Sequence, residues 1–174
     1  MRRVLVVVAA AAVVPVLGAC GGTTSGTATT STGAVEVALW NPCTEIPEDL
    51  LRQLDVDPAT EESGIAGVEQ SGWEICKWAG REYFLTVYST RHTVREIEQK
   101  PGNVEFAPVT VGSRTGQSYR VEGAGKTYNC DIVFSARQGA VSLRIGNRAS
   151  GDNSTDPCTT ARAAADVLVP VFPG

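Results

Sequence analysis

The chain has one histidine and one methionine among its 174 residues, and it contains no C-x-x-C pair. A Ser–His–Asp triad would need His92 as its base, but only local hydroxyl groups lie near it in sequence and no G-x-S-x-G elbow occurs. His92 is also far in sequence from every cysteine, which does not fit the ligand spacing of a zinc site. We therefore expect no catalytic residue, no metal site and no cofactor.

A membrane-spanning apolar run is also missing. The apolar run at residues 4–17 holds about fourteen residues, whereas a spanning helix needs about 20. It directly follows Arg2 and Arg3, and a short apolar run behind a positive start is typical of a signal peptide. We predict a signal peptide over residues 1–19.

The run ends in Leu17, Gly18, Ala19 and Cys20. This ending resembles the lipobox of bacterial lipoproteins, which implies cleavage after Ala19 and a diacylglycerol group on the Cys20 sulfur. An ordinary signal peptide with a chance cysteine is the alternative. Because two acyl chains hold a protein stably on a bilayer, we expect a lipid-anchored protein on the extracytoplasmic face of the cell membrane. Residues 20–38 would be the lipidated cysteine and a flexible Gly/Ser/Thr tether, and residues 39–174 a single domain.

Positive charge is scarce. The chain has 15 basic and 19 acidic side chains, and two of the basic ones belong to the predicted signal peptide, so the remaining chain carries a formal charge of −6. Nucleic-acid binding depends on neutralising phosphates, and attachment to anionic lipid depends on clustered basic residues. The composition therefore argues against a nucleic-acid partner and against a polybasic membrane contact.

Four cysteines follow Cys20 in the chain: Cys43, Cys76, Cys130 and Cys158. An even number in an exported chain indicates disulfides. Three pairings are open at this point, and the elements that carry the cysteines help to choose among them.

Helical spacing occurs at both ends of the domain. One amphipathic helix is expected behind a Thr44 cap, followed by a turn at residues 55–58 and a loop at residues 60–72. A short surface helix is expected at residues 93–100. Asp156 should cap a last helix with Pro157 in its first turn. The stripe of that helix that packs on the sheet would hold Cys158, Ala161, Arg162, Ala165, Leu168 and Val169.

Alternating apolar and polar residues predict strands at residues 73–79, 82–90, 117–122 and 128–136, another after residue 139, and a weak edge strand at 104–111. Cys130, Ile132 and Phe134 should face the core, whereas Asp131, Ser142 and Arg144 should face outward. One polar face per strand indicates an antiparallel sheet covered on one side. The fold class we expect is α+β, with N- and C-terminal helices packed on the sheet.

This arrangement favours Cys43–Cys76 and Cys130–Cys158 among the three pairings. Cys43 begins the first helix and Cys76 lies in the first strand, whereas Cys158 begins the last helix and Cys130 lies on the core face of a strand. Each bond would then join one helix to the sheet.

Four short motifs occur in a characteristic order: N-P-C-x-x-I-P at residues 41–47, C-x-W at 76–78, the lone Cys130, and D-P-C at 156–158 before an Ala-rich helix that ends in V-x-P. Together with the lipobox, this order is similar to a family of actinobacterial lipoproteins catalogued as domain of unknown function 3558. The resemblance implies an envelope lipoprotein with two disulfides and supplies no activity. At the level of fold, the helix–sheet–helix order looks like a Mog1/PsbP-type sandwich, which is an analogy only.

The hypothesis that follows is a non-catalytic binding or accessory module, either a ligand carrier or a sensor subunit, with an envelope protein, lipid or glycan as partner. The alternative is a hydrolase acting on envelope glycan or lipid through two carboxylates. Aromatic residues either line a groove for such a ligand or only pack in the core. They form two groups in sequence: Trp73, Trp78, Tyr83, Phe84 and Tyr88, and Tyr119 with Tyr128.

Overall fold

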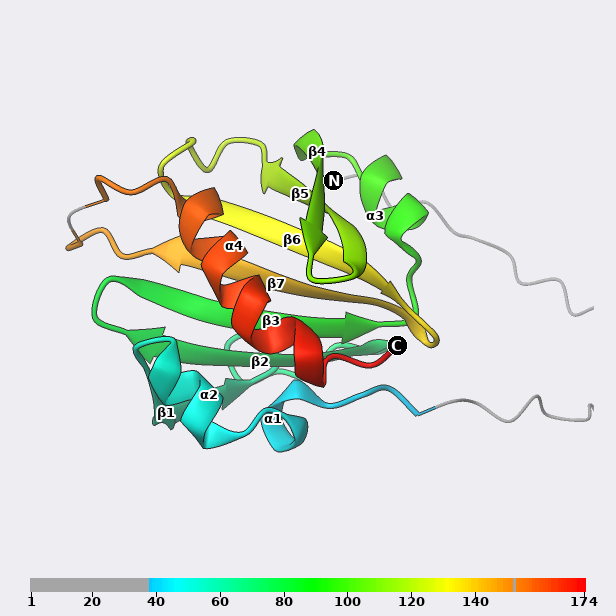
Figure 1. Ribbon diagram of the computed structural model, residues 1–174, viewed down its shortest axis with the longest axis horizontal. Coiled ribbons are helices and arrows are strands. Elements are labelled where there is room, and N and C mark those ends of the chain that lie inside the picture. The colour runs from blue at the N-terminus through cyan, green and yellow to red at the C-terminus, as the bar shows by residue number, and fades with distance from the viewer. Residues whose placement is uncertain (1–37, 152) are drawn as a thin grey trace, which may run out of the picture. The chain divides into compact units, whose positions relative to one another are not determined.

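The computed structural model describes residues 38–151 and 153–174, so the predicted signal peptide, Cys20 and most of the predicted tether lie outside the described residues. Its centre is a seven-stranded antiparallel sheet in the order β1-β2-β3-β7-β6-β5-β4 (Figure 1). The α+β prediction is confirmed. The strands are β1 (Val56–Ser63), β2 (Trp73–Gly80), β3 (Tyr83–Thr90), β4 (Asn103–Val111), β5 (Arg114–Val121), β6 (Asn129–Ala136) and β7 (Gly139–Asn147).

The main core lies between one face of this sheet and the helix α4 (Pro157–Leu168), which crosses β6 and β7 (Figure 1). Asp156 caps α4 as predicted, because its side chain accepts a hydrogen bond of 2.8 Å from the Cys158 amide. The buried side of α4 consists mainly of alanines, and small side chains let the helix approach the sheet closely. Arg162 was wrongly predicted on this side: it is exposed, and Ala164 is buried in its place. No described helix is long and apolar enough to cross a membrane.

The first helix is two helices rather than the predicted one. The helix α1 (Pro42–Glu45) is capped by Asn41, not Thr44, and α2 (Glu48–Gln53) begins after Pro47. Ile46 between them is extended, with φ −89° and ψ 117°. A residue before proline is sterically driven out of the helical region, so Pro47 separates the two helices while Ile46 still reaches the core.

The predicted loop at residues 60–72 is also wrong in part, because its first residues belong to the edge strand β1, which pairs with β2. The turn expected at 55–58 is reduced to Asp55, whose φ is +52°. Most β1 side chains are exposed or half-buried, so this edge strand shows no apolar alternation, although α2 packs against it and Val56 joins the main core. The short helix α3 (Val94–Gln99) forms as predicted, with a capping box between Thr93 and Glu96.

The sheet is covered on both faces, contrary to the prediction of one covered face. A second, smaller apolar cluster of Ile97, Tyr119, Val133 and Ala140 lies on the side away from α4. There α3 and the loop between β1 and β2 lie against the sheet, so that Asp131 and Ser142 are buried, not outward-facing. Polar side chains on this face are therefore covered by other parts of the protein rather than by solvent. Alternation along a strand does not show which of the two covers its polar face.

The predicted disulfide pairing is confirmed. Disulfide bonds join Cys43 to Cys76 and Cys130 to Cys158, at S–S distances of 2.09 and 2.00 Å. The first bond ties α1 to β2, and the second ties the first turn of α4 to β6. Both ends of the domain are thus fixed covalently to the same sheet.

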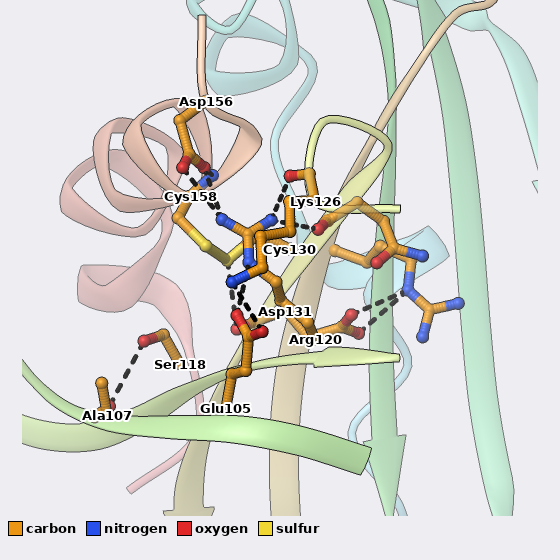
Figure 2. The surroundings of a disulfide bond; sticks show 11 residues. Glu105, Ala107, Ser118, Arg120, Lys126, Cys130, Asp131, Asp156 and Cys158 are labelled. Carbon is orange, nitrogen blue, oxygen red and sulfur yellow. Dashed lines mark hydrogen bonds and ion pairs between the residues drawn. A yellow bond between two sulfur atoms is a disulfide. The ribbon is translucent and has the colours of Figure 1, made fainter. Parts of the chain in front are cut away.

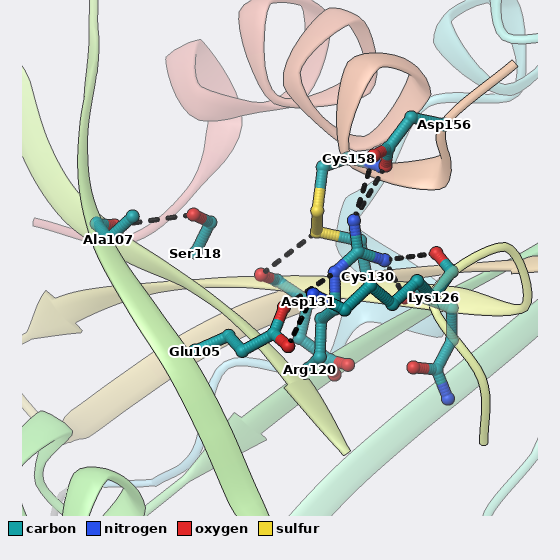
Figure 3. Close-up of polar contacts among 10 residues, drawn as sticks. Glu105, Ala107, Ser118, Arg120, Lys126, Cys130, Asp131, Asp156 and Cys158 are labelled. Atoms are coloured by element: carbon teal, nitrogen blue, oxygen red, sulfur yellow. Dashed lines mark hydrogen bonds and ion pairs between the residues drawn. A yellow bond between two sulfur atoms is a disulfide. The ribbon is translucent and has the colours of Figure 1, made fainter. Parts of the chain in front are cut away.

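Arg120 reinforces the second disulfide. Its terminal nitrogens donate to both carboxylate oxygens of Asp156 at 2.9 Å and to backbone carbonyls at Lys126 and Asn129. Figure 2 shows this guanidinium beside the Cys130–Cys158 bond, and Figure 3 shows Glu105 of β4 reaching it from another side. A planar fork of donors can satisfy several acceptors at once. Arg120 therefore joins the cap of α4 to β4, β6 and the loop before β6.

We predict that Cys130→Ser lowers the free energy of unfolding by about 3 to 4 kcal/mol, because the bond closes a loop of 28 residues in the unfolded chain. Chemical denaturation under oxidising conditions measures the change. Cys158→Ser is the matched control, since it removes the same bond and should lose the same amount. An unchanged unfolding midpoint in either variant would show that the bond does not hold α4 on the sheet.

Candidate ligand-binding site

A cavity of about 520 Å³ opens on the face of the sheet away from α4. Its floor is formed by side chains of β2, β3, β5, β6 and β7, and its walls by the β1–β2 loop and by the segment from α3 into β4. This volume lies within the range of about 300 to 1,000 Å³ that small-molecule sites have in proteins. The residues that matter most for its chemistry are Trp73, Tyr88, Lys100, Tyr119, Asp131 and Arg144.

The sheet register brings three of these side chains into one row. Asp131 on β6 is directly opposite Tyr119 on β5 and Arg144 on β7. Directly opposite residues in an antiparallel pair have their Cβ atoms about 5 Å apart and on the same face. The backbone pairing alone therefore sets a carboxylate between a phenol and a guanidinium on the floor of the cavity.

Asp131 and Arg144 form an ion pair. Nε of Arg144 donates to both carboxylate oxygens of Asp131, at 2.9 and 3.1 Å. The Asp131 side chain is 1% exposed, whereas that of Arg144 is 32% exposed. A buried charge is tolerated when it is paired and hydrogen-bonded. The pair therefore presents one enclosed end, the carboxylate, and one accessible end, the guanidinium.

Burial sets the protonation behaviour of this row. It raises the pKa of Asp131, while Arg144 and the Tyr119 hydroxyl oppose that rise. Burial is the largest single influence on Arg144 and lowers its pKa, but Asp131, Tyr88 and Tyr119 together raise the pKa of Arg144 overall. Burial and the same carboxylate raise the pKa of Tyr119. Arg144 therefore stays cationic and Tyr119 stays a neutral hydrogen-bonding group near neutral pH.

Aromatic rings from the strands line the floor of the cavity. The Trp73 and Tyr88 rings meet edge to face with centroids 6.3 Å apart, and the Arg144 guanidinium lies over the Tyr88 ring at 5.6 Å. Tyr119 stacks on Phe106 at 5.1 Å. These contacts hold the rings in place through quadrupole and cation–π attraction, so the floor exists before any ligand arrives.

The aromatic residues divide between the core and the lining of the cavity. Trp78 is fully buried in the main core, whereas Trp73, Tyr88 and Tyr119 line the cavity. Tyr128 does neither, because it is 51% exposed. The alternation of side chains along a strand separates these roles: Trp73 and Trp78 lie five residues apart, an odd number, and so point to opposite faces of β2.

His92 does not line the cavity. Its Nδ1 lies 3.6 Å from the Glu96 carboxylate, and its ring centroid lies 5.5 Å from that of Trp73. The hydroxyls near it in sequence have structural tasks: Thr93 caps α3, and Thr90 donates to the Gly72 carbonyl. Within the described residues, the one grouping with metal-ligand side chains is Cys43, Glu61 and Cys76, whose sulfurs are joined in a disulfide and so offer no thiolate.

The sequence model of one protein family, described as proteins of unknown function and named DUF3558, matches residues 15–171. The chain belongs to the DUF3558 family. Searches of curated proteins and of solved structures found no match. The likeness to Mog1/PsbP-type sandwiches therefore stays an analogy, and the function of this DUF3558 domain has to be argued from its own site.

The sequence contained a signal for the ion pair that was not used. The turn between β6 and β7 pairs Ala136 with Gly139, and counting back along both strands puts Asp131 opposite Arg144. Opposite charges directly across two strands are a favourable pair. The cavity itself had no such signal, because its walls come from the β1–β2 loop and from α3, which are distant in sequence from the strands they cover.

We predict that Arg144→Met lowers the free energy of unfolding by about 3 to 5 kcal/mol, because Asp131 is left as an unpaired buried charge. Adding Asp131→Asn should restore most of the loss. The single variant should also regain stability as the pH falls from neutral, since burial raises the pKa of Asp131 in the folded protein and protonation removes the charge.

Urea denaturation at several pH values, with the double variant as control, measures both effects. Equal losses in the single and double variants would contradict the assignment of the cost to an unpaired Asp131. So would a single-variant stability that falls, rather than rises, on mild acidification.

Proposed function

We propose that this DUF3558 protein is a lipoprotein of the cell envelope, anchored through Cys20, whose domain binds a small molecule in the cavity above the Asp131–Arg144 pair without catalysing a reaction. The ligand would be carried or sensed on the extracytoplasmic face of the membrane. The observation on which the proposal mainly rests is the cavity itself, which is large, preformed and lined by aromatic rings around the accessible guanidinium of Arg144.

Two features support export and anchoring. The ending Leu17, Gly18, Ala19 and Cys20 resembles a lipobox. The two disulfides of the domain are of the kind that forms and persists outside the reducing cytoplasm. Both features fit a chain that crosses the membrane early and folds on its outer side.

The chemistry of the cavity supports binding over hydrolysis. A glycosidase of the usual kind places two carboxylates about 5 to 10 Å apart across the bond to be cleaved. Among the described residues that line this cavity, Asp131 is the one carboxylate, and both of its oxygens accept from Arg144. A group held in that way is suited to fixing a guanidinium, and less to exchanging protons with a substrate.

We predict that Cys20→Ala abolishes partitioning of the protein into membranes, because the acyl chains have no other sulfur at the predicted cleavage site to attach to. Fractionation of cells expressing either form, followed by mass analysis of the N-terminal peptide, measures this. Ala19→Ser is a suitable control, since a small residue remains before the cysteine. Membrane retention of Cys20→Ala would count against lipidation.

Native mass spectrometry of the lipoprotein extracted from its own membrane should show a bound small molecule. Ser71→Trp places a bulky ring at the wall of the cavity and should reduce the bound fraction. Glu69→Trp is the matched control, because Glu69 is exposed on the same loop and does not line the cavity. A bare mass in the unmodified protein, or equal loss in both variants, would contradict binding in this cavity.

A further inference from the structure

The guanidinium of Arg144 has donors to spare. An arginine carries five N–H donors, and the Asp131 carboxylate uses only the one on Nε. Within the part of the chain that the structure describes, Nη1 and Nη2 have no hydrogen-bond acceptor. Because Asp131 fixes the base of the guanidinium and Tyr88 lies against its face at 5.6 Å, the edge that carries these donors is held in position beside open space.

The lining of the cavity is electropositive although the chain is acidic. Lys100, at the C-terminal end of α3, and Arg144 both line it, against the single carboxylate of Asp131. The Lys100 charge acts on Asp131 across the cavity, since it helps to lower the pKa of that carboxyl. One unneutralised cation in a partly enclosed space attracts an anion, and a guanidinium edge fits the two oxygens of a carboxylate or phosphate.

Apolar side chains also line the cavity, beside the polar side chains of Gln70, Ser71, Asn103 and Ser142. Trp73 and Ile75 lie on β2 beside Tyr88, and Ile65 lies near the start of the β1–β2 loop. Ile65 is 57% exposed although it lines the cavity. A large apolar side chain left open at the mouth of a pocket is covered favourably by the apolar part of a ligand, at roughly 25 cal/mol per Å².

We propose that the ligand is an anionic amphiphile: a carboxylate or phosphate head held by the Nη donors of Arg144 and by Lys100, with an apolar body lying against Trp73 and Ile65. This inference rests on the binding function proposed above and specifies its ligand class. Head-group recognition takes place on the floor of the cavity, and the apolar body extends toward the mouth beneath the β1–β2 loop.

Isothermal titration calorimetry tests the ligand class. The chain without the predicted signal peptide, residues 20–174, is used with Cys20→Ala, which removes the proposed acyl group and the apolar run and with them the need for detergent. The probes are decanoate and decyl phosphate, decanol as the neutral molecule of equal chain length, and acetate and inorganic phosphate as anions without a chain. We expect both anionic amphiphiles to bind, and decanol, acetate and phosphate to bind at least about tenfold more weakly.

Two variants with matched controls locate the contacts. Lys100→Gln should weaken decanoate binding severalfold and leave decanol unchanged, whereas Lys126→Gln, which alters a lysine paired with Glu105 elsewhere, should change neither. Ile65→Ser should weaken both probes, whereas Val68→Ser, which alters a residue 61% exposed on the same loop, should weaken neither. These surface changes leave the Asp131–Arg144 pair intact, so the result does not depend on the stability of Arg144 variants.

The outcomes separate the two proposals. Equal binding of decanol and decanoate overturns the anionic head group and leaves the binding function standing. Failure of every probe, in a protein whose native mass shows a bound molecule, also overturns the amphiphile and leaves the binding function standing. Failure of every probe together with a bare native mass overturns both. Equal effects of Lys100→Gln and Lys126→Gln overturn the assigned position of the head group.

Discussion

The alternation of side chains along β6 is the constraint on which both faces of the sheet depend. Consecutive residues of a strand point to opposite faces, so Cys130 and its neighbour Asp131 serve different layers. Cys130 is bonded to Cys158 and holds α4 over the main core. Asp131 holds Arg144 on the other face, at the floor of the cavity. One strand therefore holds the terminal helix on one face of the sheet and the ion pair of the site on the other.

The buried ion pair is better explained by its role in positioning the Arg144 guanidinium than by a contribution to the stability of the fold. Taking two charges out of water costs free energy that their attraction often only balances, and apolar replacements of such pairs are frequently as stable. An arginine held by a carboxylate on one side and an aromatic face on the other is, however, well ordered. Because the Arg144 side chain is already ordered, it loses less conformational entropy when a ligand binds. The Asp131–Arg144 pair thus makes sense as a preorganised end of a binding site.

Features encoded locally could be predicted from the sequence. The Asp156 cap, the alternating strands and the disulfide pairing follow from a few adjacent residues and from which element carries each cysteine. Features that depend on distant segments could not. The strand β1 is polar because it lies at an edge. The second face of the sheet is covered by a loop and a helix, and the sequence pattern of the strands beneath them does not indicate that cover. The outward assignment of Asp131 was wrong for this reason, although hairpin register could have paired it with Arg144.

The most direct test is a crystal structure of the lipoprotein purified from its own membrane under conditions that retain bound molecules. The account predicts electron density for a single small molecule between the Nη atoms of Arg144 and the Trp73 ring, with Asp131 still bound to Nε. Trp73 and Tyr119 side chains packed into the cavity, with the Nη atoms of Arg144 hydrogen-bonded to protein oxygens, would contradict it. In that case the cavity would be a packing feature, and the family's function would have to be sought on another surface.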